Sequence, residues 1–404
     1  MRKFLSIAFV LLLCLTVLPL SGCEKKEDQL TLNVYNWGEY ISDGSEDSLD
    51  VNKAFEAYCR DELGMEVTVN YTTYASNEDM YNKLKSGSTT YDVIIPSEYM
   101  IEKMIAEDML SPLNFDNIPN FEYIAPEFKN LFYDPKNLYS VPYTYGMVGI
   151  IYNSDIVDEE DIGSWDLLWN EKYKGQILQF NNPRDAFGTA IYWAGEDVNS
   201  TDPQVWYDAV EKLKIQKPLV QSYVMDEIFN KMKNGSASVA PYYAGDYLTM
   251  YDDNDSLKFY YPKEGTNVFV DAMCVPKCTK NQELAELYIN FMLSEEIAIA
   301  NAEYIGYASP NVLVRDNEDY IADMLDWNED AIKILYPSEE DKVKTSYYES
   351  LDLKTLALQN SLWESLKIEN AVEPWIYIAS GGIVGALLLF FLYRAIRKKY
   401  RDNY

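Results

Sequence analysis

Short apolar strands alternate with amphipathic helices in the N-terminal part of this 404-residue chain, and this alternation restricts the possible folds more than any other feature. The first strand begins at Leu30 and shows period-two hydrophobicity, with Leu32 and Val34 on one face and Tyr35 on the other. The predicted elements that follow are a helix over 49–63, a strand over 65–71, a helix over 77–84, an apolar strand over 91–95 and a helix over 100–109. Apolar strands that alternate with helices are typical of a parallel sheet buried on both faces. The pattern therefore predicts an α/β fold.

Three chemically distinct side chains follow the first strand. Trp37, Glu39 and Tyr40 lie in a turn just past the strand end, where α/β proteins place ligand contacts. An indole face, a carboxylate and a phenol suit an elongated organic cation, because aromatic faces accept methylenes and charge while the acid pairs with an ammonium group. The alternative interpretation is that the two aromatic residues cap the core at the end of the strand.

Polar residues also follow two later strands. Ser97 and Tyr99 lie where the strand over 91–95 meets the next helix, and the serine is placed to cap that helix and still face a cleft. The sequence NNPRD at 181–185 lies between a predicted strand over 175–180 and a helix from residue 186. Both positions are candidate ligand contacts.

Strands and helices continue to alternate beyond residue 140. An extended crossing segment is predicted over 141–151. The other predicted elements are helices over 165–169, 204–215, 226–234, 283–294 and 296–302, strands over 238–243, 258–261 and 268–275, and a turn over 305–311. A chain of this length can hold two domains with ample cores.

The charge composition narrows the possible functions. The chain has 65 acidic and 34 basic residues, a formal net charge of −31, and no histidine. Histidine-based acid–base or metal chemistry is therefore excluded. Such an acidic body repels nucleic acid and attracts cations.

The N-terminus has the pattern of a secretory leader. Arg2 and Lys3 precede an apolar run that ends in Leu-Ser-Gly-Cys at residues 20–23. This ending resembles the lipobox of bacterial lipoproteins, in which Cys23 becomes the acylated N-terminus after cleavage. Residues 24–29 would then form a short polar tether. Ordinary signal-peptide cleavage nearby is the alternative, and both interpretations imply export.

Three cysteines remain after removal of the leader and the lipid site. Cys59, Cys274 and Cys278 cannot all pair with one another, and we expect buried or half-buried thiols. A bridge between Cys274 and Cys278 stays open. A zinc site is improbable without histidine or a CxxC pair.

The C-terminus contains a long uncharged segment. Residues 375–393 carry no charge, enough at about 1.5 Å per residue to cross roughly 30 Å of hydrocarbon. Trp375 and Tyr393 lie near its ends, as in an aromatic belt, and the basic tail 394–404 follows. We expect a transmembrane helix with the tail in the cytoplasm; a buried core helix is the alternative.

Six motifs in order resemble one family. YNWGEYI, YDVIIPSEYM, SVPYTYG, YPKEG, VFVDAM and IGYASPN are similar to segments of the polyamine (spermidine/putrescine) binding proteins of bacterial ABC importers. The resemblance covers residues 30–367. It implies a type II periplasmic-binding-protein fold, with two discontinuous α/β lobes that close by hinge motion around a ligand. We expect lobe 1 at 30–145 and 271–312, and lobe 2 at 146–270 and 313–368.

The resemblance also implies which residues bind the ligand. The positions that match the polyamine contacts of the family are Trp37, Glu39, Tyr40, Ser97, Tyr99, Asn182, Arg184, Asp185, Tyr243, Phe269, Asp271, Tyr307 and Glu349. Asp271 and Asp185 match acids that hold amines. Four positions depart from the family pattern: Asn182 replaces a carboxylate, Tyr243 and Phe269 replace tryptophans, and Gly38 replaces a hydroxyl residue.

The expected function is capture of polyamines outside the cytoplasm for delivery to an ABC permease in the membrane, with no cofactor, no catalysis and no nucleic-acid partner. A polyamine-sensing receptor is a second possibility. A third is a ferric-ion binding protein that uses the tyrosine pairs at 242–243 and 260–261, although adjacent strand residues face opposite sides. A carboxylate pair of the glycosidase kind is not singled out by any spacing.

Overall fold

The structure is a computed structural model that describes residues 29–45, 47–338, 341, 343–368 and 394. Its first six elements alternate between strand and helix as the sequence predicts. They are β1 (Leu30–Trp37), α2 (Val51–Leu63), β2 (Val67–Tyr74), α3 (Asn77–Lys85), β3 (Val93–Ile94) and α4 (Glu98–Ala106). β1 pairs in parallel with both β2 and β3. Helix α2 begins after the cap Asp50 and ends at Gly64, whose φ of 67° is the left-handed conformation that glycine adopts without strain.

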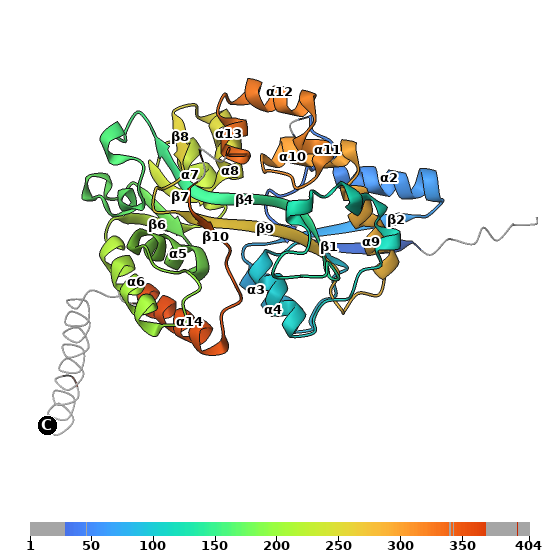
Figure 1. Cartoon of the computed structure of the whole chain (residues 1–404), viewed down its shortest axis with the longest axis horizontal. Helices are drawn as coiled ribbons and strands as arrows, with labels where there is room; N and C mark the ends of the chain where they lie inside the picture. Colours follow the sequence, from blue (N-terminus) through green and yellow to red (C-terminus); the bar gives the residue numbers. More distant parts are fainter. Residues whose placement is uncertain (1–28, 46, 339–340, 342, 369–393, 395–404) are drawn as a thin grey trace, which may run out of the picture.

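Two long antiparallel strands run through the middle of the molecule (Figure 1). They are β4 (Ser140–Asn153) and β9 (Thr266–Cys274). The first half of β4 pairs with β9, and its second half pairs with β7 (Val239–Tyr243) and β8 (Leu257–Tyr260). β9 also pairs with β3, in the antiparallel sense. The sheet is therefore mixed and not wholly parallel as the sequence pattern suggested, because these strands return along it in the opposite direction.

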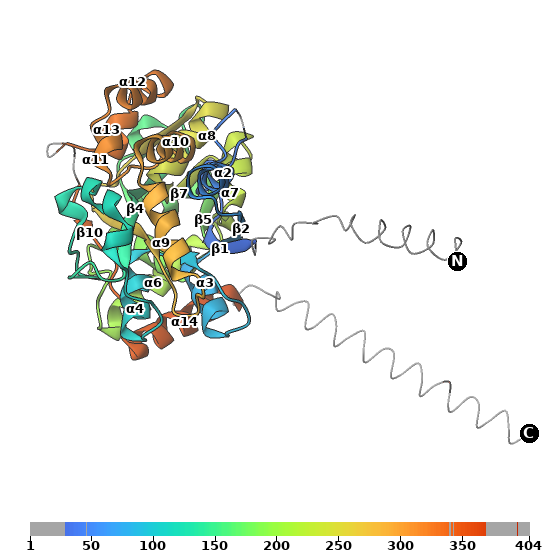
Figure 2. The same ribbon diagram turned by 90° about the vertical axis from the view of Figure 1, so that its right-hand side faces the viewer.

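The other half of the molecule surrounds a second group of strands. Its strands are β5 (Ile177–Phe180), β6 (Val220–Val224), β7 (Val239–Tyr243) and β8 (Leu257–Tyr260), and its helices are α5 (Pro183–Ala194), α6 (Pro203–Gln216), α7 (Glu227–Lys233) and α8 (Ala244–Asp253). The overall strand order is β2-β1-β3-β9-β4-β7-β5-β6. In Figure 2 the strands lie between a layer of helices with α8, α10 (Glu295–Ile305) and α12 (Glu318–Trp327) and another with α3, α4, α6 and α14 (Leu353–Ile368).

Residues after β9 return to both groups of strands. The helices there are α9 (Gln282–Met292), α10 (Glu295–Ile305), α11 (Val312–Arg315), α12 (Glu318–Trp327), α13 (Ala331–Leu335) and α14 (Leu353–Ile368). Short 3-10 helices occupy Phe115–Asn117, Pro119–Tyr123, Pro126–Phe128, Glu159–Asp161, Trp165–Trp169 and Glu171–Tyr173. The strand β10 (Thr345–Ser346) pairs in parallel with the start of β9.

Three apolar clusters form the core. Leu32 and Val34 belong to one cluster, whereas Tyr35 belongs to another on the opposite face of β1, which confirms the predicted alternation. The third and largest cluster surrounds β5 and β7 and includes the fully buried Phe187 and Trp206. Burial of large side chains of this kind contributes about 1.5–3 kcal/mol each.

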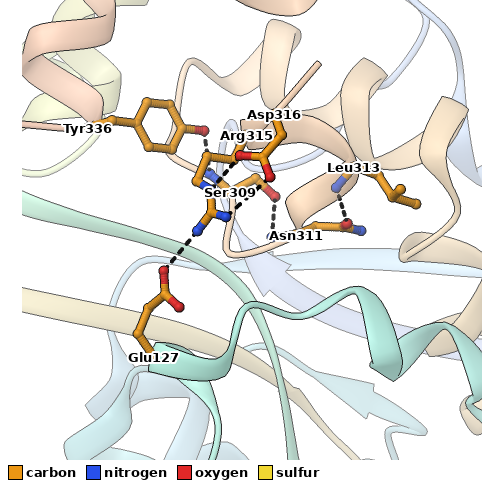
Figure 3. A network of polar contacts seen from close by, with 7 residues as sticks. All are labelled: Glu127, Ser309, Asn311, Leu313, Arg315, Asp316 and Tyr336. Carbon is orange, nitrogen blue, oxygen red and sulfur yellow. Dashed lines mark hydrogen bonds and ion pairs between the residues drawn. The ribbon is translucent and has the colours of Figure 1, made fainter.

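The chain crosses between the two groups of strands again at residues 306–316. Figure 3 shows how this crossing is held: the Ser309 amide donates to the Tyr336 hydroxyl at 3.1 Å, and the Asn311 amide donates to Ser309 Oγ at 3.2 Å. Arg315 donates to Glu127 Oε1 at 2.8 Å and so connects the end of α11 to the 3-10 helix at Pro126–Phe128.

Several sequence predictions lie outside the described residues. These are the leader with Cys23, most of the tether 24–29, the segment 375–393 and all of the basic tail except Arg394. Within the described part of the chain, no helix has the length and apolarity needed to cross a membrane.

The cysteine prediction is wrong for one residue. Cys59 and Cys274 are buried free thiols as expected, and the burial of Cys274 raises its pKa well above the usual value. Cys278 is also a free thiol, but it is exposed, because it lies in the turn after β9 and not in the strand.

Candidate functional site

The carboxyl ends of several strands meet at a cavity between the two groups of strands. Eleven of the thirteen predicted ligand-binding residues line it. They are Trp37, Tyr40, Ser97, Tyr99, Asn182, Arg184, Asp185, Tyr243, Phe269, Asp271 and Tyr307. Glu39 and Glu349 do not line this cavity: both are exposed, and Glu39 lies in a wider opening beside it.

Aromatic side chains form much of the cavity wall. The rings of Tyr40 and Tyr307 meet edge to face with centroids 5.0 Å apart, and Phe269 contacts both Tyr243 and Tyr307 in the same manner. Trp37 is fixed by a hydrogen bond from its Nε1 to the carbonyl of Ile95 at 3.0 Å. Tyr243 and Phe269, which were expected to replace tryptophans, therefore still provide aromatic rings to the cavity wall.

Asp271 is a nearly fully enclosed acid at the centre of the site. It lies on β9, only 4% exposed, and its Oδ2 accepts a hydrogen bond from the Tyr40 hydroxyl at 2.7 Å. Its Oδ1 is buried and has no hydrogen-bond partner. Burial raises the pKa of Asp271 to about 6. A buried carboxylate oxygen without a donor is an acceptor available to a ligand.

Asp246 is a second buried acid, and the sequence analysis did not identify it. It lies in the first turn of α8, 8% exposed, and its Oδ2 accepts from the Tyr307 hydroxyl at 3.0 Å. Burial raises its pKa well above the usual value, and the charge of Asp226 adds to this effect. A signal was present, because Asp246 follows Tyr243 at the start of a helix just as Asp185 follows Asn182.

Gly38 and Asp226 lie opposite each other across the cavity. A Cβ atom at Gly38 would lie 2.5 Å from Asp226 Oδ2, so the absence of a side chain at 38 leaves room for this carboxylate. Burial and the charge of Glu39 raise the pKa of Asp226. The space that a side chain at 38 would need is thus taken by Asp226, the cap residue before α7 (Glu227–Lys233).

Asn182 caps helix α5. Its Oδ1 accepts from the Asp185 amide at 2.8 Å, and its Nδ2 donates to Asp185 Oδ2 at 2.8 Å. With Pro183 in the first position, the helix begins three residues earlier than the predicted start at 186. The Tyr243 hydroxyl also donates to Asp185 Oδ2, at 2.6 Å. Asp185 therefore receives two hydrogen bonds from neutral protein groups.

The two terminal nitrogens of the Arg184 guanidinium are bonded to protein groups, whereas its Nε is buried without a partner. The guanidinium donates to the carbonyl of Val198 at 3.0 Å, to Asn199 Oδ1 at 2.7 Å and to the carbonyl of Glu349 at 3.1 Å. It also lies 4.4 Å from the ring centre of Tyr348. Arg184 thus holds the C-terminal segment against α5, and Tyr348, not the predicted Glu349, is the residue of this segment that lines the cavity.

Ser97 occupies the cap position of α4, but its side chain does not cap the helix as expected. Its Oγ accepts instead from Asn77 Nδ2 at 3.0 Å. The Tyr99 hydroxyl accepts from the same amide group and donates to Glu78 Oε1, both at 3.1 Å. Helix α4 begins at Glu98, two residues before its predicted start, because Ser97 already has cap geometry.

The tyrosine pairs considered for metal binding, 242–243 and 260–261, have other surroundings in the structure. Tyr260 and Tyr261 donate to the backbone carbonyls of Ser164 and Ile334. Tyr242 and Tyr243 both line the cavity, although adjacent strand residues were expected on opposite faces; β7 ends there, at the start of α8. Among the described residues, no three histidine, cysteine or acidic side chains are grouped to hold a metal ion.

The family profile described as bacterial extracellular solute-binding protein matches residues 88–333. The spermidine/putrescine-binding periplasmic protein of Salmonella typhimurium is 35% identical over 289 residues, covering 71% of this chain and 80% of that protein. Two solved structures each match 84% of this chain and 99% of their own. One is a Listeria monocytogenes protein assigned to a spermidine/putrescine ABC transporter, with 33% identity and a TM-score of 0.74. The other is the spermidine/putrescine ABC transporter substrate-binding protein PotD of Streptococcus pneumoniae, with 36% identity and a TM-score of 0.67.

Proposed function

The chain belongs to the family of bacterial extracellular solute-binding proteins, and from this premise we propose that it captures polyamines outside the cytoplasm and delivers them to an ABC permease. The observation that carries the proposal is the pair of buried acids, Asp271 and Asp246, in an aromatic cavity. Among the described residues that line this cavity, Arg184 is the only base, and its guanidinium is bonded to protein groups. The acids are therefore left for a cationic ligand.

The energetics favour a ligand with at least two ammonium groups. A buried ammonium group costs several kcal/mol unless it is paired. A hydrogen bond to a carboxylate returns about 1.5–3 kcal/mol, and contact with an aromatic face returns roughly 0.5–2 kcal/mol. Pairing at Asp271 and Asp246, with ring contacts to the methylenes between them, is sufficient for a dissociation constant of about 1 μM or tighter. Binding of this kind needs no covalent step.

The environment of Asp185 favours a diamine. Asn182 and Tyr243 already donate to its carboxylate, and the cation of Arg184 is the adjacent residue. An ammonium group beside Asp185 would therefore meet less net negative charge than one beside Asp246, which has the carboxylate of Asp226 nearby. We therefore infer that putrescine-like diamines are held at least as well as triamines.

Ligand capture requires two lobes that move relative to each other. We infer that lobe 1 comprises residues 30–145 and 271–312 and that lobe 2 comprises residues 146–270 and 313–368. The long strands β4 and β9 and the crossing at 306–316 support this division, because each runs from one group of strands to the other. Hinge closure would then bring Tyr40 and Asp271 toward Tyr243 and Asp185.

We infer two membrane attachments for this protein, one on each lobe. The first is lipid at Cys23, six residues before the start of the described chain near β1, and the second is a helix over 375–393, shortly after α14 ends at Ile368. The basic residues after 393 support a cytoplasmic tail. The binding region would then lie on the outer side of the membrane.

Calorimetric titration of the purified full-length protein tests the proposed function. Putrescine, spermidine and spermine are the test ligands, and ferric ion tests the metal-binding alternative. We expect micromolar or tighter binding of at least one polyamine and no saturable binding of iron. Absence of binding for all three amines would contradict the proposal.

A further inference from the structure

Glu98 is a buried acid with no role in the site described above. It is the first residue of α4, has an exposed fraction of 0%, and lines the same cavity as Asp271. Its neighbours in sequence, Ser97 and Tyr99, were expected at the site, whereas Glu98 was not. A carboxyl group of this kind is rarely buried unless it is paired.

The hydrogen bonds of Glu98 place it beside Asp271. Its Oε2 accepts from the backbone amide of Val270 at 3.0 Å, and Asp271 is the next residue along β9. Ser97, the residue before Glu98, forms a backbone bridge with Asp271 itself. Asp271 is thus paired through the backbone with the residue before Glu98, and Glu98 is hydrogen-bonded to the residue before Asp271.

Each of these two acids has one oxygen without a partner. Glu98 Oε1 and Asp271 Oδ1 are both buried and accept no hydrogen bond from the described protein. Buried polar atoms are nearly always satisfied, so two unsatisfied acceptors on neighbouring residues of one cavity indicate a missing donor. An ammonium group carries at least two N–H donors and a positive charge.

We propose that Glu98 is a second amine-binding carboxylate and that it and Asp271 hold one ammonium group of the ligand between them. This proposal rests on the proposed function, because the ammonium group belongs to the bound polyamine. It assigns two acids to that ammonium group instead of one. The carboxylate of Glu98 would then compensate for the carboxylate that Asn182 replaces.

An ammonium group bound between Glu98 and Asp271 would displace a proton that these acids hold in the empty site. The charged and titratable groups around Glu98 are Asp271 on β9, Arg184 on α5, and the phenols of Tyr133, Tyr347 and Tyr348. Burial and then the like charge of Asp271 raise the pKa of Glu98 well above its usual range. Two adjacent buried acids keep a proton when no cation is present. The ammonium group replaces this proton, so binding releases it.

Calorimetry with putrescine tests this exchange in the full-length protein. Titrations at pH 7.5 in buffers of different ionisation enthalpy give the number of protons released. Asp271, with a pKa of about 6, is already ionised at this pH, but burial also raises the pKa of Asp246, so the difference between the wild type and Glu98→Gln is what reports Glu98. We expect the wild type to release about one proton more than Glu98→Gln. We expect Glu98→Gln to bind putrescine about tenfold or more weakly.

The variant is chosen to preserve the fold. Glutamine keeps the oxygen that accepts from the Val270 amide, so a role limited to that hydrogen bond predicts unchanged affinity. Glu286→Gln is the matched control. Glu286 is also a buried acid, 1% exposed, but it accepts from Asn114 and Asn117 outside the cavity, so its change should alter neither affinity nor proton release.

The possible outcomes separate the two proposals. If the wild type binds no polyamine, the proposed function itself fails. If it binds putrescine without proton release, or if Glu98→Gln binds as tightly as the wild type, only the role of Glu98 is overturned. Should Glu98→Gln not fold, as judged by circular dichroism, Asp246→Asn decides the matter, because it lacks the other site acid whose pKa is raised well above its usual value: release of about one proton supports the role of Glu98, and no release overturns it.

Discussion

The Tyr40 hydroxyl donates a hydrogen bond to Asp271 Oδ2 at 2.7 Å, joining residues that are 231 positions apart in the chain. This contact orients the carboxylate and leaves Oδ1 for the ligand. Asp271→Asn keeps the shape but removes the charge, so we expect polyamine binding to weaken by about 2–3 kcal/mol with an intact fold. Calorimetry and circular dichroism check this. Unchanged affinity in a folded variant would contradict the assignment of Asp271.

Affinity should depend on pH below neutrality. Burial raises the pKa of Asp271 to about 6, and its charged form is the one that pairs with an ammonium group. Because the acid becomes protonated as the pH falls through this value, we expect about tenfold weaker binding at pH 5 than at pH 7. Titration with putrescine from pH 5 to 8 measures the profile. The affinity of the Asp271→Asn variant should lack this dependence on pH, because the variant has no acid to protonate at this position.

The same shift predicts how stability depends on pH without ligand. The folded protein binds a proton at Asp271 up to about pH 6, whereas the unfolded chain releases it near pH 4. The free energy of unfolding should therefore fall, by up to about 3 kcal/mol, as the pH rises from about 4 to about 6. Urea unfolding of the wild type and of Asp271→Asn at these pH values isolates this contribution.

Asp246 should be as important as Asp271, although no sequence motif identified it. Asp246→Asn removes the charge of a nearly buried acid, so we expect putrescine to bind about 10- to 100-fold more weakly. Asp252→Asn is the control, because Asp252 is an exposed acid of the wider opening that does not line the inner cavity. Equal losses in the two variants would indicate a general effect of net charge and not a specific contact.

The contact between Gly38 and Asp226 can be tested by a double-mutant cycle. Gly38→Ala places a Cβ 2.5 Å from Asp226 Oδ2 and must displace that carboxylate. We expect weaker polyamine binding from Gly38→Ala alone and little further loss when Asp226 is already alanine, with a coupling energy of about 0.5–3 kcal/mol. If the two losses simply add, the side chain of Asp226 does not act through this contact.

The two proposed membrane attachments make separate predictions. Cys23→Ala removes the lipid but leaves residues 375–393, so this variant should stay in the membrane fraction. Truncation after Asn370 in the Cys23→Ala background should release the protein. Fractionation with immunodetection distinguishes these cases. Release by the Cys23 change alone would exclude the second attachment.

Much of the fold could be predicted from local patterns. The period-two hydrophobicity around Leu32 and Val34 and the helical spacing over 49–63 depend on neighbours in sequence, and they appear in the structure as a core face and as α2, which begins at Val51 after its cap Asp50. The starts of α4 and α5 were misplaced by two or three residues, because Ser97 and Asn182 adopt cap geometry that hydrophobic spacing does not reveal.

The sequence by itself determined the α/β character of this protein, its acidity, and a set of aromatic and acidic residues at strand ends, eleven of which line one cavity. It did so because strand ends and helix starts are local features of the chain. Only the tertiary structure decided which acids are enclosed together. Glu98 and Asp246 became part of the site, and Glu39 and Glu349 did not, because burial and partnership depend on contacts between segments as distant as α4 and β9.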